Sequence, residues 1–370
     1  MKAIKVPFLN LVAQHAPLKK DLLKAFSTVL GHGQFIRGPE VSEFEERFAA
    51  LSGVRHAVSV NSGTDALILA LRALGVGPGD EVITAPNSFV ASASAIRLVG
   101  ADPVFADVGE DYNLDPASVE RAVTGRTKAL LPVHLTGRPA DMTAIMRIAR
   151  RRGLLVVEDC AQAVLAEHRG RRVGSFGAAG CFSLHPLKTL NACGDGGVIA
   201  TDDEALRDRL RVLRNIGLPV RDDCVEWSGN SRLDTVQAAM LLVKLRRLES
   251  WTRQRRRNAA FYRKALSGVR GIVVPLDRPD ERAVYHTFIV QVDDRDGLRK
   301  HLAGRGVETA IHYPVPIHLQ TVAAGLRLGP GSFPVAERQA ARILSLPVYP
   351  ELTRPQLSHV VRSIKEFCLP

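Results

Sequence analysis

Apolar and polar positions form a regular pattern along the first two-thirds of the chain. Short, mostly apolar runs predict strands at 57–60, 81–84, 103–107, 128–135 and 154–159. Stretches with one apolar stripe lie between these runs and predict helices at 64–74, 89–99 and 140–153. Continuous apolar strands that alternate with helices are typical of a largely parallel sheet covered on both faces. We therefore expect an α/β fold.

The pattern changes near residue 246. Long helical patterns at 233–251 and 255–266 lead into a strand-like run at 283–292, and further helical patterns follow at 295–306 and 334–344. Helices that gather around a short run of strand are typical of an α+β unit. A chain of 370 residues also has the length of a large domain with a smaller companion. We expect a large domain over 1–246 and a small domain over 247–370.

Composition narrows the class of protein. Hydrophobic residues make up 46% of the chain, but no apolar run reaches the roughly 18 residues that a membrane helix needs. The first twenty residues lack the apolar core and cleavage site of a signal peptide, so we expect a cytoplasmic protein with no membrane partner. The five cysteines form no CxxC pair, which indicates reduced thiols and neither a disulfide framework nor a metal site.

The net charge of +12 raises the question of an anionic partner. Basic residues are spread along the chain, and the densest cluster, "RQRRRNAAFYRK" at 253–264, reads as a helix with a solvated basic face. No nucleic-acid motif accompanies it, so we expect no nucleic acid partner. A basic surface could instead gather an anionic small substrate.

Polar residues follow several of the predicted strands, where open parallel sheets bind their ligands. In "NSGTDAL", Gly63 and Thr64 open a helix and could present backbone N–H groups and a hydroxyl to a phosphate, although a plain helix cap is the alternative. Asp159 ends a buried strand, where a helix cap is again the alternative. Lys188 lies on the turn of "CFSLHPLKTLNACGDGG", and a surface lysine is its simplest reading. Together, a phosphate cradle, a carboxylate and a lysine are what pyridoxal phosphate needs.

With these motifs, the chain resembles the DegT/DnrJ/EryC1/StrS family of sugar aminotransferases. The landmarks "GQFIRGPEVSEFEERFA", "VNSGTDALILALRALGVGPGDEVITAPNSFVASASAI", "LLVVEDCAQA", "GCFSLHPLK", "GNSRLDTVQAAMLLVKL" and "IHYPVPIHLQ" follow one another in the family's order over essentially the whole chain. The resemblance implies the fold-type I architecture of pyridoxal-phosphate transferases. This architecture has a mostly parallel seven-stranded sheet between helices and a smaller C-terminal α+β domain.

The resemblance also implies a role for each matching residue. Lys188 would be the Schiff-base lysine and Asp159 the partner of the pyridine nitrogen. The remaining cofactor contacts would be Gln162 at the phenolic oxygen, Phe89 stacked on the ring, and Gly63, Thr64 and Ser183 at the phosphate. Asn230 would reach the phosphate from the other subunit, which implies a homodimer with shared active sites.

Five residues are candidates for substrate contacts: His185, Arg232, His312, Tyr313 and His318. His185 could instead be a local hydrogen-bond partner, and Arg232 could be a salt-bridge residue at a helix start. The stretch "IHYPVPIHLQ" is interpreted as a rigid extended loop beside the substrate pocket, because its two histidines have no clear metal geometry.

The function that the resemblance implies is transfer of an amino group from glutamate to a keto-sugar. The expected acceptor is a nucleotide-linked 3-keto or 4-keto deoxysugar, and a non-nucleotide oxo-sugar acid stays open. A second alternative is the dehydratase branch, which carries histidine in place of the lysine, so Lys188 argues against it. A third is a non-catalytic cofactor-binding regulator, which Lys188, Asp159 and Gln162 disfavour.

Overall fold

The computed structural model describes residues 4–368 and is built around one seven-stranded sheet. The strands lie in the order β1-β9-β8-β5-β4-β2-β3, and only β9 runs against its neighbours. The strands are β1 (His56–Val60), β2 (Glu81–Thr84), β3 (Asp102–Phe105), β4 (Thr127–Leu131), β5 (Leu155–Asp159), β8 (Ala179–Ser183) and β9 (Gly197–Thr201). This arrangement confirms the mostly parallel seven-stranded sheet expected from the sequence.

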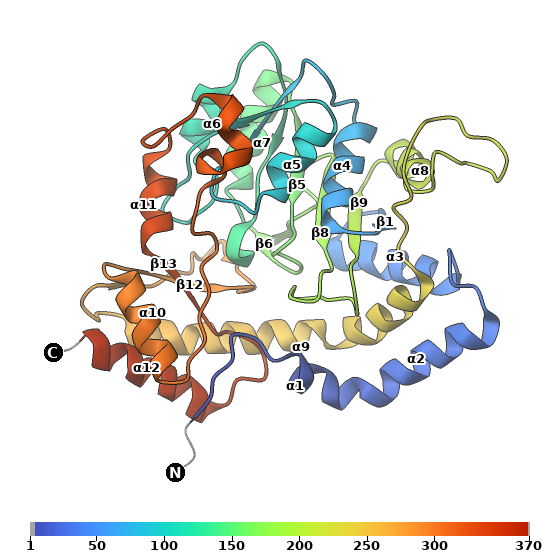
Figure 1. Ribbon diagram of the computed structural model, residues 1–370. Helices are drawn as coiled ribbons and strands as arrows, with labels where there is room; N and C mark the ends of the chain where they lie inside the picture. Colours follow the sequence, from blue (N-terminus) through green and yellow to red (C-terminus); the bar gives the residue numbers. More distant parts are fainter. Residues whose placement is uncertain (1–3, 369–370) are drawn as a thin grey trace.

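Helices cover both faces of this sheet, as the apolar strands require (Figure 1). In β9, Ile199 packs into the core on one face, whereas Val198 and Ala200 pack into the core on the other. The first face is covered by α4 (Gly63–Ala73), α5 (Ala91–Leu98) and α8 (Glu204–Leu213), and the second by α3 (Pro39–Ser52), α6 (Pro116–Ala122), α7 (Met142–Arg152) and the first half of α9 (Thr235–Leu266). A sheet buried on both faces leaves its strand ends as the place for a ligand.

The predicted elements are mostly confirmed, with two corrections of length. Helix α7 begins at the cap of Asp141, whose side chain accepts from the Ala144 N–H, and ends at Gly153 in the left-handed region, as the sequence pattern indicated. The strand expected at 128–135 ends at Leu131, and the strand expected at 283–292 is formed only over 288–292. A third correction is one of type: the helix expected at 334–344 ends at Arg342, and residues 343–346 form a strand.

A single long helix, α9, joins the large sheet to a smaller unit (Figure 1). The two helices expected over 233–266 are therefore one helix of 32 residues, and the boundary expected at 246/247 falls inside it. The smaller unit has a three-stranded sheet of β10 (Ile272–Val273), β12 (Phe288–Val292) and β13 (Ile343–Leu346) with helices α10 (Arg295–Gly304), α11 (Pro334–Arg342) and α12 (Arg354–Cys368). The division of the chain into two domains stays a prediction.

The chain around Val6, which we grouped with the large domain, packs on the smaller unit. Val6 is fully buried in the core of the smaller unit, and its N–H donates to the carbonyl oxygen of Gly306 at 2.9 Å. The remaining elements are α1 (Leu11–His15), α2 (Lys19–His32), β6 (Glu167–His168), β7 (Arg171–Arg172), β11 (Glu281–Arg282) and four 3-10 turns at Ala16–Leu18, Leu135–Gly137, Ile317–Leu319 and Thr321–Leu326. None of the described helices has the length and apolar character to cross a membrane.

Candidate active site

A cavity of about 390 Å³ lies where the ends of the large sheet meet the smaller unit. Asp159 from β5 and Lys188 from the turn after β8 both line it. The two strands are parallel neighbours in which Asp159 pairs with Cys181, so their carboxyl ends emerge side by side. The cavity therefore brings together the carboxylate and the lysine that the sequence singled out.

The carboxylate of Asp159 is buried and oriented by two donors. Its Oδ2 accepts from Ser92 Oγ at 2.8 Å, and its Oδ1 accepts from the Ala161 N–H at 3.1 Å. Ser92 also forms a 2.7 Å hydrogen bond with Ser88 Oγ. These contacts hold an acceptor toward the cavity, where it suits a protonated ring nitrogen. Sequence reasoning missed both serines.

Lys188 is the one lysine among the cavity-lining residues that the structure describes. Its backbone N–H donates to the carbonyl oxygen of His185 at 2.8 Å, and Asn191 Nδ2 donates to its carbonyl oxygen at 3.1 Å, which fixes the turn. Burial lowers the pKa of the Lys188 amine, while the negative charge of Asp159 acts in the opposite direction. A lowered pKa increases the fraction of the neutral amine, which is the nucleophilic form.

The opposite side of the cavity is formed by the start of α4. Ser62 caps the helix by accepting from the Asp65 N–H at 3.0 Å, so the N–H groups of Gly63 and Thr64 are left without intrahelical acceptors. A Cβ added at Gly63 would lie 2.6 Å from the Cβ of Ser183, so only glycine fits there. The free N–H groups at this helix N-terminus, together with the hydroxyls of Thr64 and Ser183, suit a phosphate.

Three further side chains line the cavity where a planar ring could bind: Gln162, Phe89 and Tyr313. Gln162 Oε1 accepts from the Thr136 N–H at 2.6 Å, and its Nε2 lies 3.4 Å from Tyr313 Oη. The rings of Phe89 and Tyr313 lie 5.6 Å apart, and Phe89 is 55% exposed. An exposed aromatic ring at the mouth of a cavity is available for stacking on a planar ligand.

Two histidines and one arginine from the smaller unit and its connecting helix also reach this cavity. Burial, with a further contribution from Lys188, lowers the pKa of His312 to about 4, and the same causes hold the pKa of His286 well below its usual value. Arg255 of α9 is only 3% exposed. It belongs to the cluster expected to form a solvated basic face, so that expectation is wrong at this position. Neither His286 nor Arg255 was predicted as a site residue.

Three of the residues expected in the site do not line the cavity of their own chain. Asn230 is exposed, and Arg232 donates to Asn215 Oδ1 at 2.9 Å. His318 is buried elsewhere, with its Nε2 2.9 Å from Glu337 Oε1 and its ring against Phe333. His185 does line the cavity at its exposed edge. The proposed contacts of Asn230 and Arg232 therefore require a second chain.

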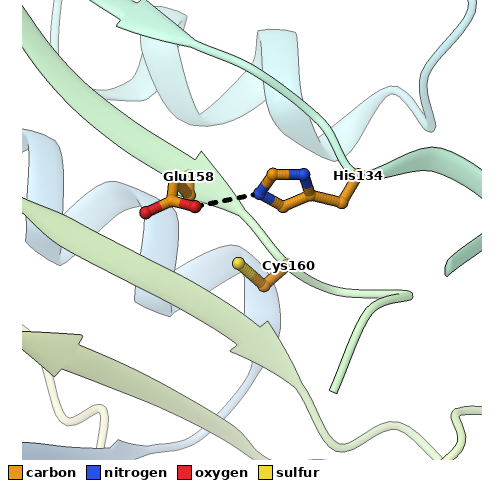
Figure 2. Close-up of side chains that lie close together, drawn as sticks. All are labelled: His134, Glu158 and Cys160. Carbon is orange, nitrogen blue, oxygen red and sulfur yellow. Dashed lines mark hydrogen bonds and ion pairs between the residues drawn. The ribbon is translucent and has the colours of Figure 1, made fainter. Parts of the chain in front are cut away.

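Glu158 and Cys160, which flank Asp159 in the sequence, form with His134 a buried cluster that has the spacing of metal ligands (Figure 2). His134 Nδ1 accepts from the Ala140 N–H at 3.0 Å, so His134 Nε2 carries the proton and donates to Glu158 Oε2 at 3.0 Å. The same carboxylate accepts three backbone N–H groups, from residues 174, 176 and 177. Burial raises the pKa of the Cys160 thiol well above its usual value. The lone pairs are thus already used, and we interpret the cluster as a structural support for β5.

Comparison with known proteins agrees with this geometry. The chain is 47% identical to the dTDP-3-amino-3,4,6-trideoxy-alpha-D-glucose transaminase of Streptomyces venezuelae, over 98% of this chain and 96% of that protein. It is 48% identical to the erythromycin biosynthesis sensory transduction protein EryC1 of Saccharopolyspora erythraea, over 97% of this chain and 99% of that protein. The crystal structure of S. venezuelae DesV in complex with a ketimine intermediate superposes with a TM-score of 0.97 at 47% identity, covering 99% of both chains.

A family-level comparison covers residues 17–365, nearly the whole chain. Together with the superposition, it confirms the fold-type I architecture and the pyridoxal-phosphate cofactor that the resemblance implied. The cavity fits this cofactor by its own chemistry, since the lysine, the carboxylate and the glycine-lined start of α4 all line it. The chain belongs to the DegT/DnrJ/EryC1/StrS aminotransferase family.

Proposed function

We propose that this aminotransferase moves an amino group from glutamate to C-3 of a nucleotide-linked keto-sugar. The observation that carries the proposal is the convergence of Lys188, Asp159 and the α4 N-terminus on one cavity. The identity of 47% to a transaminase whose name specifies a dTDP-linked 3-amino sugar supports this class of acceptor. The "IHYPVPIHLQ" loop contributes His312 and Tyr313 to the lining of the cavity.

Pyridoxal phosphate, when bound, supplies an electron sink for the carbon that gains or loses the amino group. Asp159 would hold the proton on the pyridine nitrogen, since its two oxygens are already oriented by Ser92 and Ala161. Gln162 would donate from its Nε2 to the phenolic oxygen, because its Oε1 is occupied by the Thr136 N–H. Each of these contacts favours the charge distribution on which the electron sink depends.

Lys188 would have two roles. Its amine would first hold the cofactor covalently, and after release by the donor it would carry a proton between the two carbons that exchange the amino group. The lowered pKa increases the fraction of the neutral amine, which is the form that can accept a proton. The rings of Phe89 and Tyr313 would limit the access of water to this proton.

We also propose that the protein is a homodimer that shares its active sites. Helix α2 carries an exposed apolar stripe of Leu23, Phe26 and Leu30, which lie at the spacing of one helical face. Exposed apolar side chains that cluster in this way are typical of protein interfaces. A second chain would also explain why Asn230 and Arg232 lie away from the cavity of their own chain.

The alternative functions predict different experimental results. A dehydratase would lack the lysine at position 188, and a non-catalytic regulator, of the kind that the name of the EryC1 relative suggests, would not exchange an amino group. An enzyme whose acceptor is a non-nucleotide sugar acid would differ from the proposed one only in the second half of the reaction, in which the acceptor receives the amino group. The donor half and the acceptor half should therefore be measured separately.

The test compares the wild-type holoenzyme with Lys188→Ala, and with Lys264→Ala as an exposed control. With glutamate, the wild type and the control should convert the cofactor to its amino form, seen in the absorbance spectrum, and release 2-oxoglutarate. Lys188→Ala should do neither, and borohydride reduction should leave no cofactor attached to its peptide in mass spectrometry. Covalent cofactor on Lys188→Ala, or an inert wild type, would refute the proposal. A panel of keto-sugars then identifies the acceptor.

A further inference from the structure

Arg255 is a buried guanidinium with too few partners. It lies on α9, lines the cavity and is 3% exposed. Its Nη1 makes two long contacts of 3.4 Å with the carbonyl oxygens of Tyr285 and His286, and its Nε has no hydrogen-bond partner. A guanidinium has five N–H donors. Within residues 4–368 most of this donor capacity is unused.

Burial of an incompletely paired charge is unfavourable, and Arg255 shows this cost. Burial lowers its pKa to about 10, and the negative charge of Glu351, which acts in the opposite direction, only partly offsets this. Arg255 and Glu351 do not form an ion pair within the described part of the chain, and Glu351 Oε2 itself has no hydrogen-bond partner. The side chain stays protonated at neutral pH, so it is a cation that lacks its anion.

The position of Arg255 relates this cation to the reactive lysine. Arg255 Nη1 lies 3.4 Å from the carbonyl oxygen of His286, and both residues line the same cavity as Lys188. Among the cavity-lining residues that the structure describes, Arg255 is the one arginine. The Nδ1 atom of His286 is also buried without a partner. An anion bound by Arg255 would therefore lie in the same cavity as the Lys188 amine.

We propose that Arg255 binds the α-carboxylate of the amino donor and positions the donor for proton removal. This inference rests on the proposed aminotransferase function. A carboxylate matches the planar fork of a guanidinium. In an α-amino acid the carboxylate is one bond from the carbon that loses its proton, whereas the phosphates of a nucleotide-linked 3-keto-sugar are several bonds from the carbon that gains nitrogen. An anion site close to the lysine thus fits the donor better than the acceptor.

The test uses two donors that differ only at this carboxylate. Glutamate is compared with 4-aminopentanoate, in which a methyl group replaces the α-carboxylate and the distal carboxylate is kept. The variants are Arg255→Gln and Arg255→Lys, with Arg253→Gln, an exposed arginine on the same helix, as the matched control. Arg255→Gln should lower kcat/KM for glutamate about 100-fold, the usual scale for truncating one partner of a buried charge pair. It should leave 4-aminopentanoate and the sugar half-reaction within about threefold, since neither uses this contact.

A binding measurement checks the same point without turnover. Titration calorimetry of the holoenzyme should show that the wild type and Arg253→Gln prefer 2-oxoglutarate to 4-oxopentanoate, whereas Arg255→Gln binds both alike. Arg255→Lys, which keeps the charge but loses the planar fork, should be intermediate and serves if the glutamine variant does not fold. A preference as large as that of the wild type in either Arg255 variant, or an equal loss for both donors, would overturn the inference. A wild type that does not react with glutamate would instead refute the proposed function itself.

Discussion

Ser92 Oγ donates a 2.8 Å hydrogen bond to Asp159 Oδ2, and both side chains are buried. The Ser92 hydroxyl has a single hydrogen, which it donates to Asp159, so in its 2.7 Å contact with Ser88 Oγ it is the acceptor. The Phe89 carbonyl oxygen, at 3.2 Å, is a longer second acceptor for the Ser88 hydroxyl. The two serines therefore form a directed chain that ends on the carboxylate. This chain links the first residues of α5 to the end of β5 and sets the orientation of the group proposed to face the pyridine nitrogen.

Ser92→Ala should slow the donor half-reaction by about ten- to a hundredfold, because one hydrogen bond to a charged group is worth about 1.5–3 kcal/mol. The cofactor should still bind. Asp159→Asn should be slower by about a thousandfold or more, since an amide cannot keep the ring nitrogen protonated. Rapid mixing with glutamate and absorbance detection gives both rates. Ser94→Ala on the same helix is the control, and a Ser92→Ala variant as fast as this control would contradict the role assigned to Ser92.

Gly63→Ala should weaken cofactor binding by about tenfold or more. The added Cβ would lie 2.6 Å from the Ser183 Cβ, so either the start of α4 or the end of β8 must shift, and the phosphate donors shift with it. Gly31→Ala is the matched control, because nothing lies within 4 Å of its added Cβ. Equilibrium dialysis of the cofactor against each variant measures the difference. Equal affinities for the two variants would separate the α4 N-terminus from phosphate binding.

His312 should contribute a pH-dependent part of the stability. Burial and then Lys188 lower its pKa to about 4, so between pH 4 and 6.5 the unfolded chain binds more protons than the folded chain. The contribution is fully present above pH 6.5 and is lost as the pH falls toward 4. His312→Asn should therefore show a shallower decrease in the free energy of unfolding between pH 7 and pH 5, measured by urea denaturation. A slope as steep as that of wild type would mean that His312 titrates normally.

The meeting of Lys188 and Asp159 could be predicted from the sequence because both follow apolar strands, and parallel strands bring their carboxyl ends to one edge. The contribution of Arg255 could not. It belongs to a run of cations on one helix, in which Arg253 and Arg257 are exposed and Arg255 is buried. Which of them faces inward depends on how α9 is rotated against Tyr285 and His286, and these residues are distant in sequence. Helical period alone does not specify this rotation.

The N-terminal segment shows the same limit. Phe8 stacks on His312 at a ring distance of 5.7 Å and lines the cavity, yet nothing in its local sequence indicates a site residue. Its place follows from Val6, which pairs with the smaller unit through Gly306 and Val307. Pairings between residues three hundred positions apart leave no periodic signal in either segment.

The last prediction concerns the shared site. Asn230 follows an exposed segment and forms a bridge with Asn215, and Arg232 donates to the same Asn215, so this loop is held in place on the surface of its own chain. We expect it to serve the cavity of the partner subunit. Lys188→Ala and Asn230→Ala/Arg232→Ala should each be inactive alone, the first because it lacks the amine and the second because it lacks the contacts to the phosphate and the substrate.

Mixing these two inactive proteins should restore activity. In a heterodimer, one site receives Lys188 from one chain and Asn230 with Arg232 from the other, while the second site carries both defects. Random exchange of equal amounts places about half of the chains in heterodimers with one good site of two, so about a quarter of wild-type activity should return. Differently tagged chains and native mass spectrometry establish that exchange has occurred. Because a loop that serves its own chain leaves every site in the mixture with one defect, heterodimers without activity would show that the sites are not shared.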